Sequence, residues 1–247
     1  MTTPFKNALI IGAGRGTGRA LALQLAAQGT KVTAVARTAA DLEKLHAEAP
    51  SIKPYVGDGS AGIAANVIGK VKPDLLILAG GVTPKMGSFF DQDWESFSAT
   101  WNNDTKTTFD FLKAAIQTPL APNSTIVTLS SGAAISGSTL SGGYAGAKRM
   151  QHYLTNYAAW ESDRRNLGLR CFTVYPKQFI TGTHTADIAS QSYADARGVS
   201  QSEFMAQWEA QLTPDLLASR TLELVDPQAT QTQGAWGVTG MQMELMS

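Results

Sequence analysis

Three side chains that can move a proton to or from a carbonyl oxygen lie close together in the sequence. Tyr144 and Lys148 are four residues apart, so they share one face of a helix. The lysine ammonium favours the phenolate form of the tyrosine, which suits a general acid for a reduced carbonyl or a general base for an oxidised alcohol. Ser131 ends an apolar run thirteen residues before Tyr144 and could orient the substrate oxygen. The alternative for Tyr144 and Lys148 is an ordinary surface pair on a helix.

A glycine-rich segment near the start of the chain is the second candidate site. Gly12-Ala13-Gly14-Arg15-Gly16-Thr17-Gly18 lies between an apolar run and a helical pattern that ends at Gly29. A tight glycine turn between a strand and a helix lets the backbone approach a pyrophosphate, and the free N–H groups at the helix start point at it. The spacing is G-x-x-x-G-x-G rather than the commoner G-x-G-x-x-G. The segment predicts a nucleotide site, with a plain loop as the alternative.

The end of the second predicted strand favours NADP(H) over NAD. Enzymes that use NAD usually carry an acid there for the ribose hydroxyls, whereas this strand is followed by Arg37 and Thr38. Arg15 in the glycine loop is a second guanidinium, and such groups bind phosphate through forked, charge-assisted hydrogen bonds. We therefore expect Arg15 and Arg37 to flank a 2′-phosphate. The alternative is that either arginine is a solvated surface charge.

Strand and helix patterns alternate along the whole chain. Apolar strands are expected at 8–11, 31–36, 52–56, 74–78, 125–129, 169–174 and 234–238, and helices at 19–28, 39–49, 61–70, 94–117 and 141–166. Continuous apolar strands separated by helices predict an α/β fold with a doubly wound parallel sheet in three layers. We expect one domain over 1–247. The polar segment 179–212 reads as a long loop with a helical patch at 202–211, and such loops are often lids.

The composition of the chain argues against several classes of binding partner. Twenty basic residues balance twenty acidic ones, so no field attracts nucleic acid or a membrane surface. No apolar run is long enough to span a bilayer and no Cys/His cluster has metal-ligand spacing, and we expect no signal peptide before the first strand. We therefore expect a cytoplasmic protein with no metal. Cys171 lies in an apolar run and is expected to be a buried thiol.

Together these motifs resemble the short-chain dehydrogenase/reductase family in its single-domain branch. The resemblance covers essentially the whole chain and implies a Rossmann fold with a nicotinamide cofactor across the strand ends. It implies that Tyr144 transfers the proton, Ser131 orients the carbonyl, and Lys148 binds the nicotinamide ribose and tunes Tyr144. The cofactor contacts it implies are Gly12, Gly14, Arg15, Gly16, Thr17, Gly18, Arg37, Thr38, Asp58, Gly80, Tyr144, Lys148, Pro176 and Thr181. For Asp58, a simple turn aspartate is the alternative.

Three positions depart from the family pattern. The fourth strand ends in Leu78-Ala79-Gly80-Gly81 where the family has Asn-Asn-Ala-Gly, and Lys177 follows Pro176 where the family has glycine. The family also has an asparagine that links the catalytic lysine to a water chain. The matching position here is Asp104, with Asn103 beside it, and Asp104 would add a charge to that network.

The resulting hypothesis is an NADPH-dependent carbonyl reductase, or an alcohol dehydrogenase in reverse. The alternatives are a reductase of acyl-thioester intermediates and a non-catalytic NADP(H)-binding sensor. Ala133, Ala134, Ile135 and Leu140 indicate an apolar substrate wall, hence a hydrophobic ketone or aldehyde. The resemblance also implies a homodimer or homotetramer. His46, His152 and His184 are interpreted as non-catalytic, and Trp94, Phe97 and Trp101 as core or subunit contacts.

Overall fold

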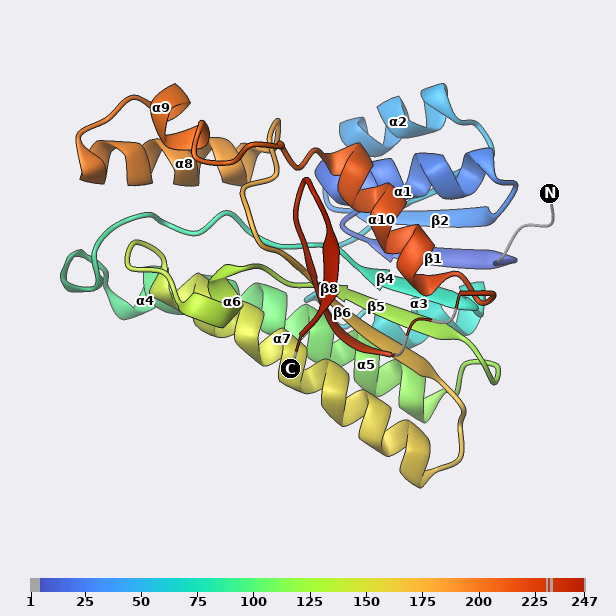
Figure 1. Ribbon diagram of the computed structural model, residues 1–247. Helices are drawn as coiled ribbons and strands as arrows, with labels where there is room; N and C mark the ends of the chain where they lie inside the picture. Colours follow the sequence, from blue (N-terminus) through green and yellow to red (C-terminus); the bar gives the residue numbers. More distant parts are fainter. Residues whose placement is uncertain (1–4, 230, 232, 247) are drawn as a thin grey trace.

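A twisted eight-stranded sheet forms the centre of the molecule (Figure 1). The computed structural model describes residues 5–229, 231 and 233–246. The strand order is β3-β2-β1-β4-β5-β6-β7-β8, with every neighbouring pair parallel except β7 and β8. The strands are β1 (Asn7–Ile11), β2 (Lys31–Ala36), β3 (Lys53–Val56), β4 (Leu75–Leu78), β5 (Thr125–Leu129), β6 (Arg170–Pro176), β7 (Gly234–Val238) and β8 (Met243–Leu245).

Helices cover both faces of this sheet and complete the three layers (Figure 1). One face carries α1 (Gly16–Ala27), α2 (Ala39–Glu48) and α10 (Pro214–Val225), and the other carries α3 (Ala64–Val71), α5 (Lys106–Gln117) and α7 (Gly142–Arg164). Further helical elements are η1 (Phe89–Asp91), α4 (Trp94–Thr100), α6 (Ala133–Ser136), α8 (His184–Arg197) and α9 (Gln201–Met205). The predicted doubly wound α/β fold is confirmed.

The central strands are buried on both faces, which explains their sequences. β4 and β5 consist entirely of buried residues, as strands of a parallel sheet between two helix layers must be. Phe172 packs with the core on the side of α1, whereas Cys171 packs with the core on the side of α5. The strand order reverses between β1 and β4, and in such sheets ligands bind in the crevice at that point, beyond the carboxyl ends of the strands.

The helix predicted over 94–117 is interrupted. A π-helical turn, η2 (Trp101–Thr105), separates α4 from α5. A π turn inserts one residue into the helical repeat and occurs often at functional sites. Here it lies where Asp104 and Thr105 are buried, so the interruption turns a carboxylate toward the interior.

The segment 179–212 was expected to be a long loop, and this prediction is wrong for much of the segment. Residues 184–197 form α8, whose N-cap residue Thr183 accepts a hydrogen bond from the N–H of Ala186 at 3.3 Å. Its small alanines and many polar residues gave no strong apolar stripe, although they form a helix once one side is buried. The helical patch expected at 202–211 is the shorter α9, and α10 and β8 were not predicted. In the described part of the chain, no helix is both long and apolar enough to span a membrane.

Candidate active site

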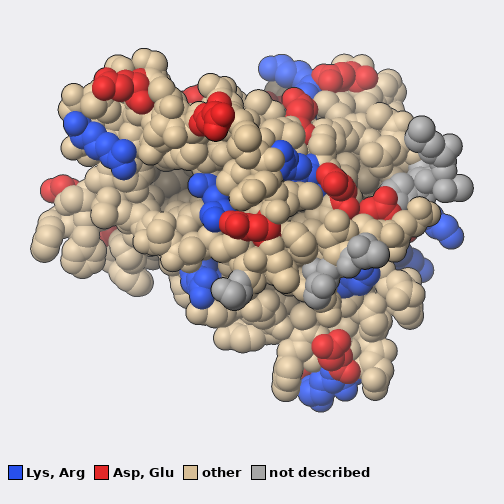
Figure 2. Space-filling view, viewed as in Figure 1, with Lys and Arg blue, Asp and Glu red and all other residues tan. Residues whose placement is uncertain are grey.

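A cleft of about 730 Å³ opens at the carboxyl ends of the strands. Its two ends are lined by the glycine loop and by Ser131, Tyr144 and Lys148, so the two candidate sites of the sequence share one cavity. Residues of α8 and α9 form part of its wall. Figure 2 shows the surface hollowed beneath the lobe that carries α8 and α9, with acidic and basic side chains interspersed over this face. The cleft therefore lies where the strand order predicts a ligand.

The glycine loop is shaped by close backbone approaches. A Cβ atom on Gly12, whose φ is +88°, would lie 2.4 Å from the Cα of Gly80, and one on Gly18 would lie 2.2 Å from the carbonyl oxygen of Gly12. Neither position can hold a side chain without moving backbone. Gly12, Gly14, Arg15, Gly16 and Thr17 line the cleft, whereas Gly18 packs behind the loop. The start of α1 is thereby open to the cleft, and this cradle fits the pyrophosphate of a dinucleotide.

The residues beyond β2 offer both cations and an acid. Arg15, Arg37 and Thr38 are exposed and line the cleft, and neither arginine forms an ion pair within the described residues. Asp41 also lines this end, and its Oδ2 would lie 3.7 Å from a Cβ atom on Gly14. Sequence reasoning missed Asp41 because it lies in α2, beyond the strand end where an acid was sought. The two guanidinium groups suit a phosphate, whereas the carboxylate suits ribose hydroxyls.

The remaining predicted cofactor contacts divide into two groups. Asp58, Gly80 and Pro176 line the cleft. Asp58 also accepts hydrogen bonds from the N–H and Oγ of Ser60, at 2.9 and 2.8 Å, and the backbone bond holds the pKa of its carboxyl below the usual value. Asp58 thus organises a turn and faces the cleft at once. Thr181 is not part of the lining and donates its hydroxyl to the carbonyl of Leu212 at 3.3 Å.

Tyr144 and Lys148 lie on the first turns of α7, as their spacing predicts. The Nζ of Lys148 is 5.5 Å from the centre of the Tyr144 ring. The Oγ of Ser130 donates to the carbonyl of Lys148 at 2.8 Å and so attaches α7 to the end of β5. The next residue, Ser131, has its Oγ 3.2 Å from the N–H of Ala133, which donates to it. The end of β5 therefore positions both the serine and the helix that carries the tyrosine.

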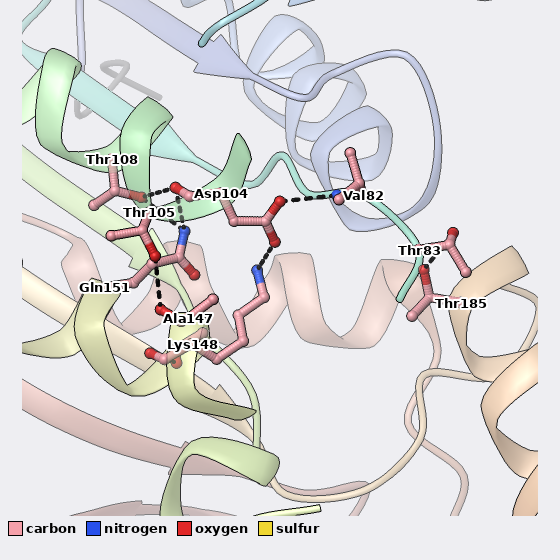
Figure 3. A network of polar contacts seen from close by, with 10 residues as sticks. Val82, Thr83, Asp104, Thr105, Thr108, Ala147, Lys148, Gln151 and Thr185 are labelled. Atoms are coloured by element: carbon pink, nitrogen blue, oxygen red, sulfur yellow. Dashed lines mark hydrogen bonds and ion pairs between the residues drawn. The ribbon is translucent and has the colours of Figure 1, made fainter. Parts of the chain in front are cut away.

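Asp104 contacts Lys148 directly. Its Oδ2 lies 3.2 Å from Nζ of Lys148, and its Oδ1 accepts the N–H of Val82 at 2.9 Å (Figure 3). Burial on its own would lower the pKa of Lys148. The electrostatic effects of Asp104 and Tyr144, together with the hydrogen bond to Asp104, outweigh burial and raise that pKa. Lys148 is therefore held as an ammonium ion. Asn103 instead lines the cleft and donates to the Oγ of Ser60 at 3.4 Å.

An aromatic cluster that sequence reasoning missed forms the outer wall of the cleft. We call Phe179, Tyr193, Phe204 and Trp208 the aromatic wall; all four line the cleft, and their ring centres lie 5.5–6.2 Å apart in contacting pairs. The hydroxyl of Tyr193 lies 2.6 Å from Oγ of Ser138. That contact joins α8 to the loop before α7. The four residues are dispersed along a segment with no clear period, so only the fold brings them together.

The histidines and aromatic residues interpreted as non-catalytic lie in different parts of the structure. His46 is 2.9 Å from the carbonyl of Ile52, and His152 packs between the rings of Tyr153 and Tyr175; neither lines the cleft. His184 lines it at the start of α8. Among the predicted core or subunit aromatics, Trp94 is 77% exposed and Trp101 is 46% exposed, so neither is a core residue. Cys171 is buried, as predicted, and burial raises its pKa to about 12.

Comparison with known proteins shows which families and proteins this chain is similar to. A family model described as short chain dehydrogenase matches residues 6–191. Among curated proteins, the chain is 53% identical to the D-erythrulose reductase of Gallus gallus over 53 residues, 22% of each chain. It is 34% identical to NADPH carbonyl reductase 2 of Sus scrofa over 104 residues, 42% of this chain and 43% of that protein. These matches span less than half of the curated relatives.

Solved structures match over nearly the whole chain. A short-chain dehydrogenase/reductase from Brucella melitensis aligns with a TM-score of 0.81 at 24% identity, covering 97% of this chain and 98% of that one. A short chain dehydrogenase from Burkholderia cenocepacia, solved in complex with NADP, aligns with a TM-score of 0.75 at 21% identity, covering 95% of each chain. At these identities the likeness establishes the fold.

Proposed function

Because the chain belongs to the short-chain dehydrogenase family, a family of oxidoreductases, we propose that it is an NADP(H)-dependent reductase of small carbonyl compounds. The observation that carries the proposal is the meeting of Ser131, Tyr144 and Lys148 in the same cleft as the glycine loop. A general acid, an oxygen-orienting hydroxyl and a dinucleotide cradle in one cavity are what carbonyl reduction requires.

The chemistry divides between the cofactor and the side chains. A bound nicotinamide would supply hydride to the carbonyl carbon. Tyr144 donates the proton to the carbonyl oxygen, and in the reverse direction accepts it from the alcohol. Ser131 orients that oxygen by a hydrogen bond, and Lys148 favours the phenolate that remains after the proton has left. Lys148 is also the side chain proposed to bind the nicotinamide ribose.

The proposed preference for the phosphorylated dinucleotide depends on Arg15 and Arg37. Both are exposed at the cleft and pair with no acid in the described part of the chain, so both are free to bind a phosphate. Asp41 lies nearby and is the residue that would favour NADH instead. One curated relative, whose name mentions NADPH, supports the first choice. Gly12, Gly14, Gly16, Thr17, Thr38, Asp58, Gly80 and Pro176 are proposed to complete the cofactor site, with Gly18 supporting the loop; Thr181 stays a prediction.

The substrate is proposed to be a hydrophobic ketone or aldehyde. Ala133, Ile135 and the aromatic wall line the substrate end of the cleft. The segment 179–212 is proposed to be the lid over that end. A reductase of acyl thioesters remains the second candidate, because the same catalytic residues serve a ketone on a longer chain. A non-catalytic sensor is less favoured, since a sensor does not need Tyr144 beside a buried ammonium.

Two further proposals concern the whole protein. We propose a homodimer or homotetramer, because α4, α5 and α7 expose large apolar side chains such as Trp94, Phe109 and Tyr157. We also propose a cytoplasmic location and small-molecule partners, with no role for nucleic acid or membrane binding.

The function is tested by turnover of a panel of ketones, aldehydes and one acyl thioester with NADPH and NADH. The proposal expects carbonyl reduction with a preference for NADPH, and a loss of about a hundredfold or more in kcat in Tyr144→Phe, with NADPH affinity retained. Tyr157→Phe, an exposed tyrosine on the same helix, is the matched control. NADPH binding with no turnover that depends on Tyr144 would instead support the sensor.

A further inference from the structure

The ion pair between Asp104 and Lys148 is enclosed beneath the cleft. The side chain of Asp104 is 0% exposed and that of Lys148 is 6% exposed, with 3.2 Å between Oδ2 and Nζ. Asp104 is not part of the cleft lining, whereas Lys148 is. Charged groups removed from water at such a place persist because each neutralises the other. The catalytic lysine therefore carries its own counter-ion, supplied by the chain and out of reach of substrate.

Asp104 is held through both its carboxylate and its backbone carbonyl. Oδ1 accepts the N–H of Val82 at 2.9 Å, and the backbone carbonyl of Asp104 accepts the Oγ1 of Thr108 at 2.9 Å and the amide of Gln151 at 3.3 Å (Figure 3). Gly81 leaves the space beside it, because a Cβ atom there would lie 2.8 Å from Oδ2 of Asp104. A carboxylate held in this way fixes the position of Nζ in turn.

Few other charges act on Lys148. Asp104 and Tyr144 are the ionisable groups that bear on it. The remaining ionisable side chains of the elements packed against α7 are Glu95 on α4, Lys106, Asp110 and Lys113 on α5, and Arg170, Cys171 and Tyr175 on β6. Lys106 pairs with Asp110, Tyr175 packs against His152 of α7, and Lys177 after β6 pairs with Glu244. The groups that act on the ammonium of Lys148 are therefore one carboxylate and one phenol.

The two charges have opposite effects on the phenol. The ammonium of Lys148, 5.5 Å from the ring centre, favours the phenolate, whereas a carboxylate beyond it disfavours the phenolate. Because the ammonium and the carboxylate are themselves buried, these interactions are screened less than between exposed charges. The carboxylate of Asp104 therefore opposes the effect of the ammonium on the phenol.

We propose that Asp104 is a positioning residue that fixes Nζ of Lys148 and offsets its charge, so that Asp104, Lys148 and Tyr144 together set the pH range of proton transfer. The inference rests on the proposed role of Tyr144 as proton donor. Asp104 acts through Lys148 and contacts neither substrate nor reacting atoms. A carboxylate at this place opposes the loss of the phenolic proton, which suits reduction.

The test is the titration of Tyr144 in Asp104→Asn, a change that removes the charge and keeps the shape. Phenolate formation is followed by ultraviolet absorbance and isolated by subtracting the same protein carrying Tyr144→Phe. The titration midpoint of Tyr144 should fall by about one pH unit. The pH profile of kcat/KM for alcohol oxidation with NADP⁺ should move in the same direction by the same amount.

Two further variants make the result decisive. Asp110→Asn removes an acid from α5 that pairs with Lys106 at the surface, and it should leave both midpoints unchanged. Asp104→Ser also removes the charge and should give the same shift. It replaces the asparagine variant in the test if that variant folds poorly. An unchanged or higher Tyr144 midpoint in either Asp104 variant overturns the inference. Because the absorbance titration needs no turnover, it separates this failure from failure of the proposed reductase activity.

Discussion

A Cβ atom on Gly81 would lie 2.8 Å from Oδ2 of Asp104 and 3.4 Å from Nζ of Lys148. Gly81, three residues after the end of β4, has no side chain because the ion pair beneath the cleft occupies that space. The close packing of Gly81, Asp104 and Lys148 thus links the segment after β4, the π turn η2 and helix α7.

Gly81→Ala should therefore misplace the Asp104 carboxylate or the ammonium of Lys148. Displacements of about 1 Å at catalytic groups can cost about a hundredfold in rate, so we expect kcat/KM to fall by one to two orders of magnitude. Gly146→Ala is the matched control, since nothing lies within 4 Å of a Cβ atom there and the position is on α7 between Tyr144 and Lys148. Equal activity of the two variants would show that the space at Gly81 is not needed.

Arg15→Met and Arg37→Met should each weaken NADPH selectively. A charge-assisted hydrogen bond contributes about 1.5–3 kcal/mol, so kcat/KM for NADPH should fall about tenfold to a hundredfold while that for NADH changes little. Arg19→Met, at an arginine of α1 that pairs with Glu48, serves as the control. Equal losses with both dinucleotides would indicate that neither guanidinium binds a 2′-phosphate.

Cys171 should make stability depend on pH above neutrality. Burial raises its pKa from 9.0 to about 12, so its thiol stays protonated in the folded chain while it ionises in the unfolded one. The stabilisation is complete below pH 9 and is lost as the pH rises toward 12, by at most about 1.4 kcal/mol per pH unit. Urea unfolding at pH 8 and pH 10 measures it. Cys171→Ala should show a smaller decline than the parent, and an equal decline would assign the effect to other groups.

The parts of this molecule that the sequence predicts well are those fixed by local pattern. Buried strands such as 75–78 are continuous apolar runs, and the glycines of the loop are required by backbone contacts between β1, β4 and α1. Tyr144 and Lys148 are placed by helical spacing alone. The apolar runs, the glycine spacing and the helical pair are local patterns that can be recognised without a structure, although the backbone that excludes a side chain at Gly12 is that of Gly80 in a distant segment.

The features that escaped prediction depend on contacts between distant segments. The resemblance already placed Asp104 in the network of Lys148, but the π turn that buries its carboxylate against Nζ was not predicted, because no periodicity announces such a turn. The helix at 184–197 has a polar composition, and the aromatic wall assembles from both sides of it. Asp41 enters the cofactor end from α2, four residues after the arginine that the strand pattern emphasised.

Tyr193→Phe should loosen the proposed lid. The hydroxyl of Tyr193 is 2.6 Å from Oγ of Ser138, which is itself 2.6 Å from Oγ of Ser141 at the start of α7. Losing one such hydrogen bond costs about 1 kcal/mol, so we expect KM for the carbonyl substrate to rise about fivefold with little change in kcat. Hydrogen exchange should also become faster in α8. Tyr157→Phe, at an exposed tyrosine, should change neither KM nor the exchange rate. Unchanged hydrogen-exchange protection of α8 in Tyr193→Phe would show that the hydrogen bond to Ser138 does not hold the lid.

The aromatic wall should set substrate preference. Phe179 contacts the rings of Tyr193, Phe204 and Trp208, so Trp208 has an aromatic neighbour on one side and the cleft on another. Removing a buried aromatic face costs a few kcal/mol of apolar contact. Trp208→Ala should therefore lower kcat/KM for an aryl ketone by about tenfold or more, and lower that for a small hydroxylated ketone much less. Trp160→Ala, at an exposed tryptophan of α7, is the control. A ratio of the two substrates that stays constant in Trp208→Ala would mean that the wall supports the lid without contacting substrate, and the hydrophobic-substrate proposal would lose its main support.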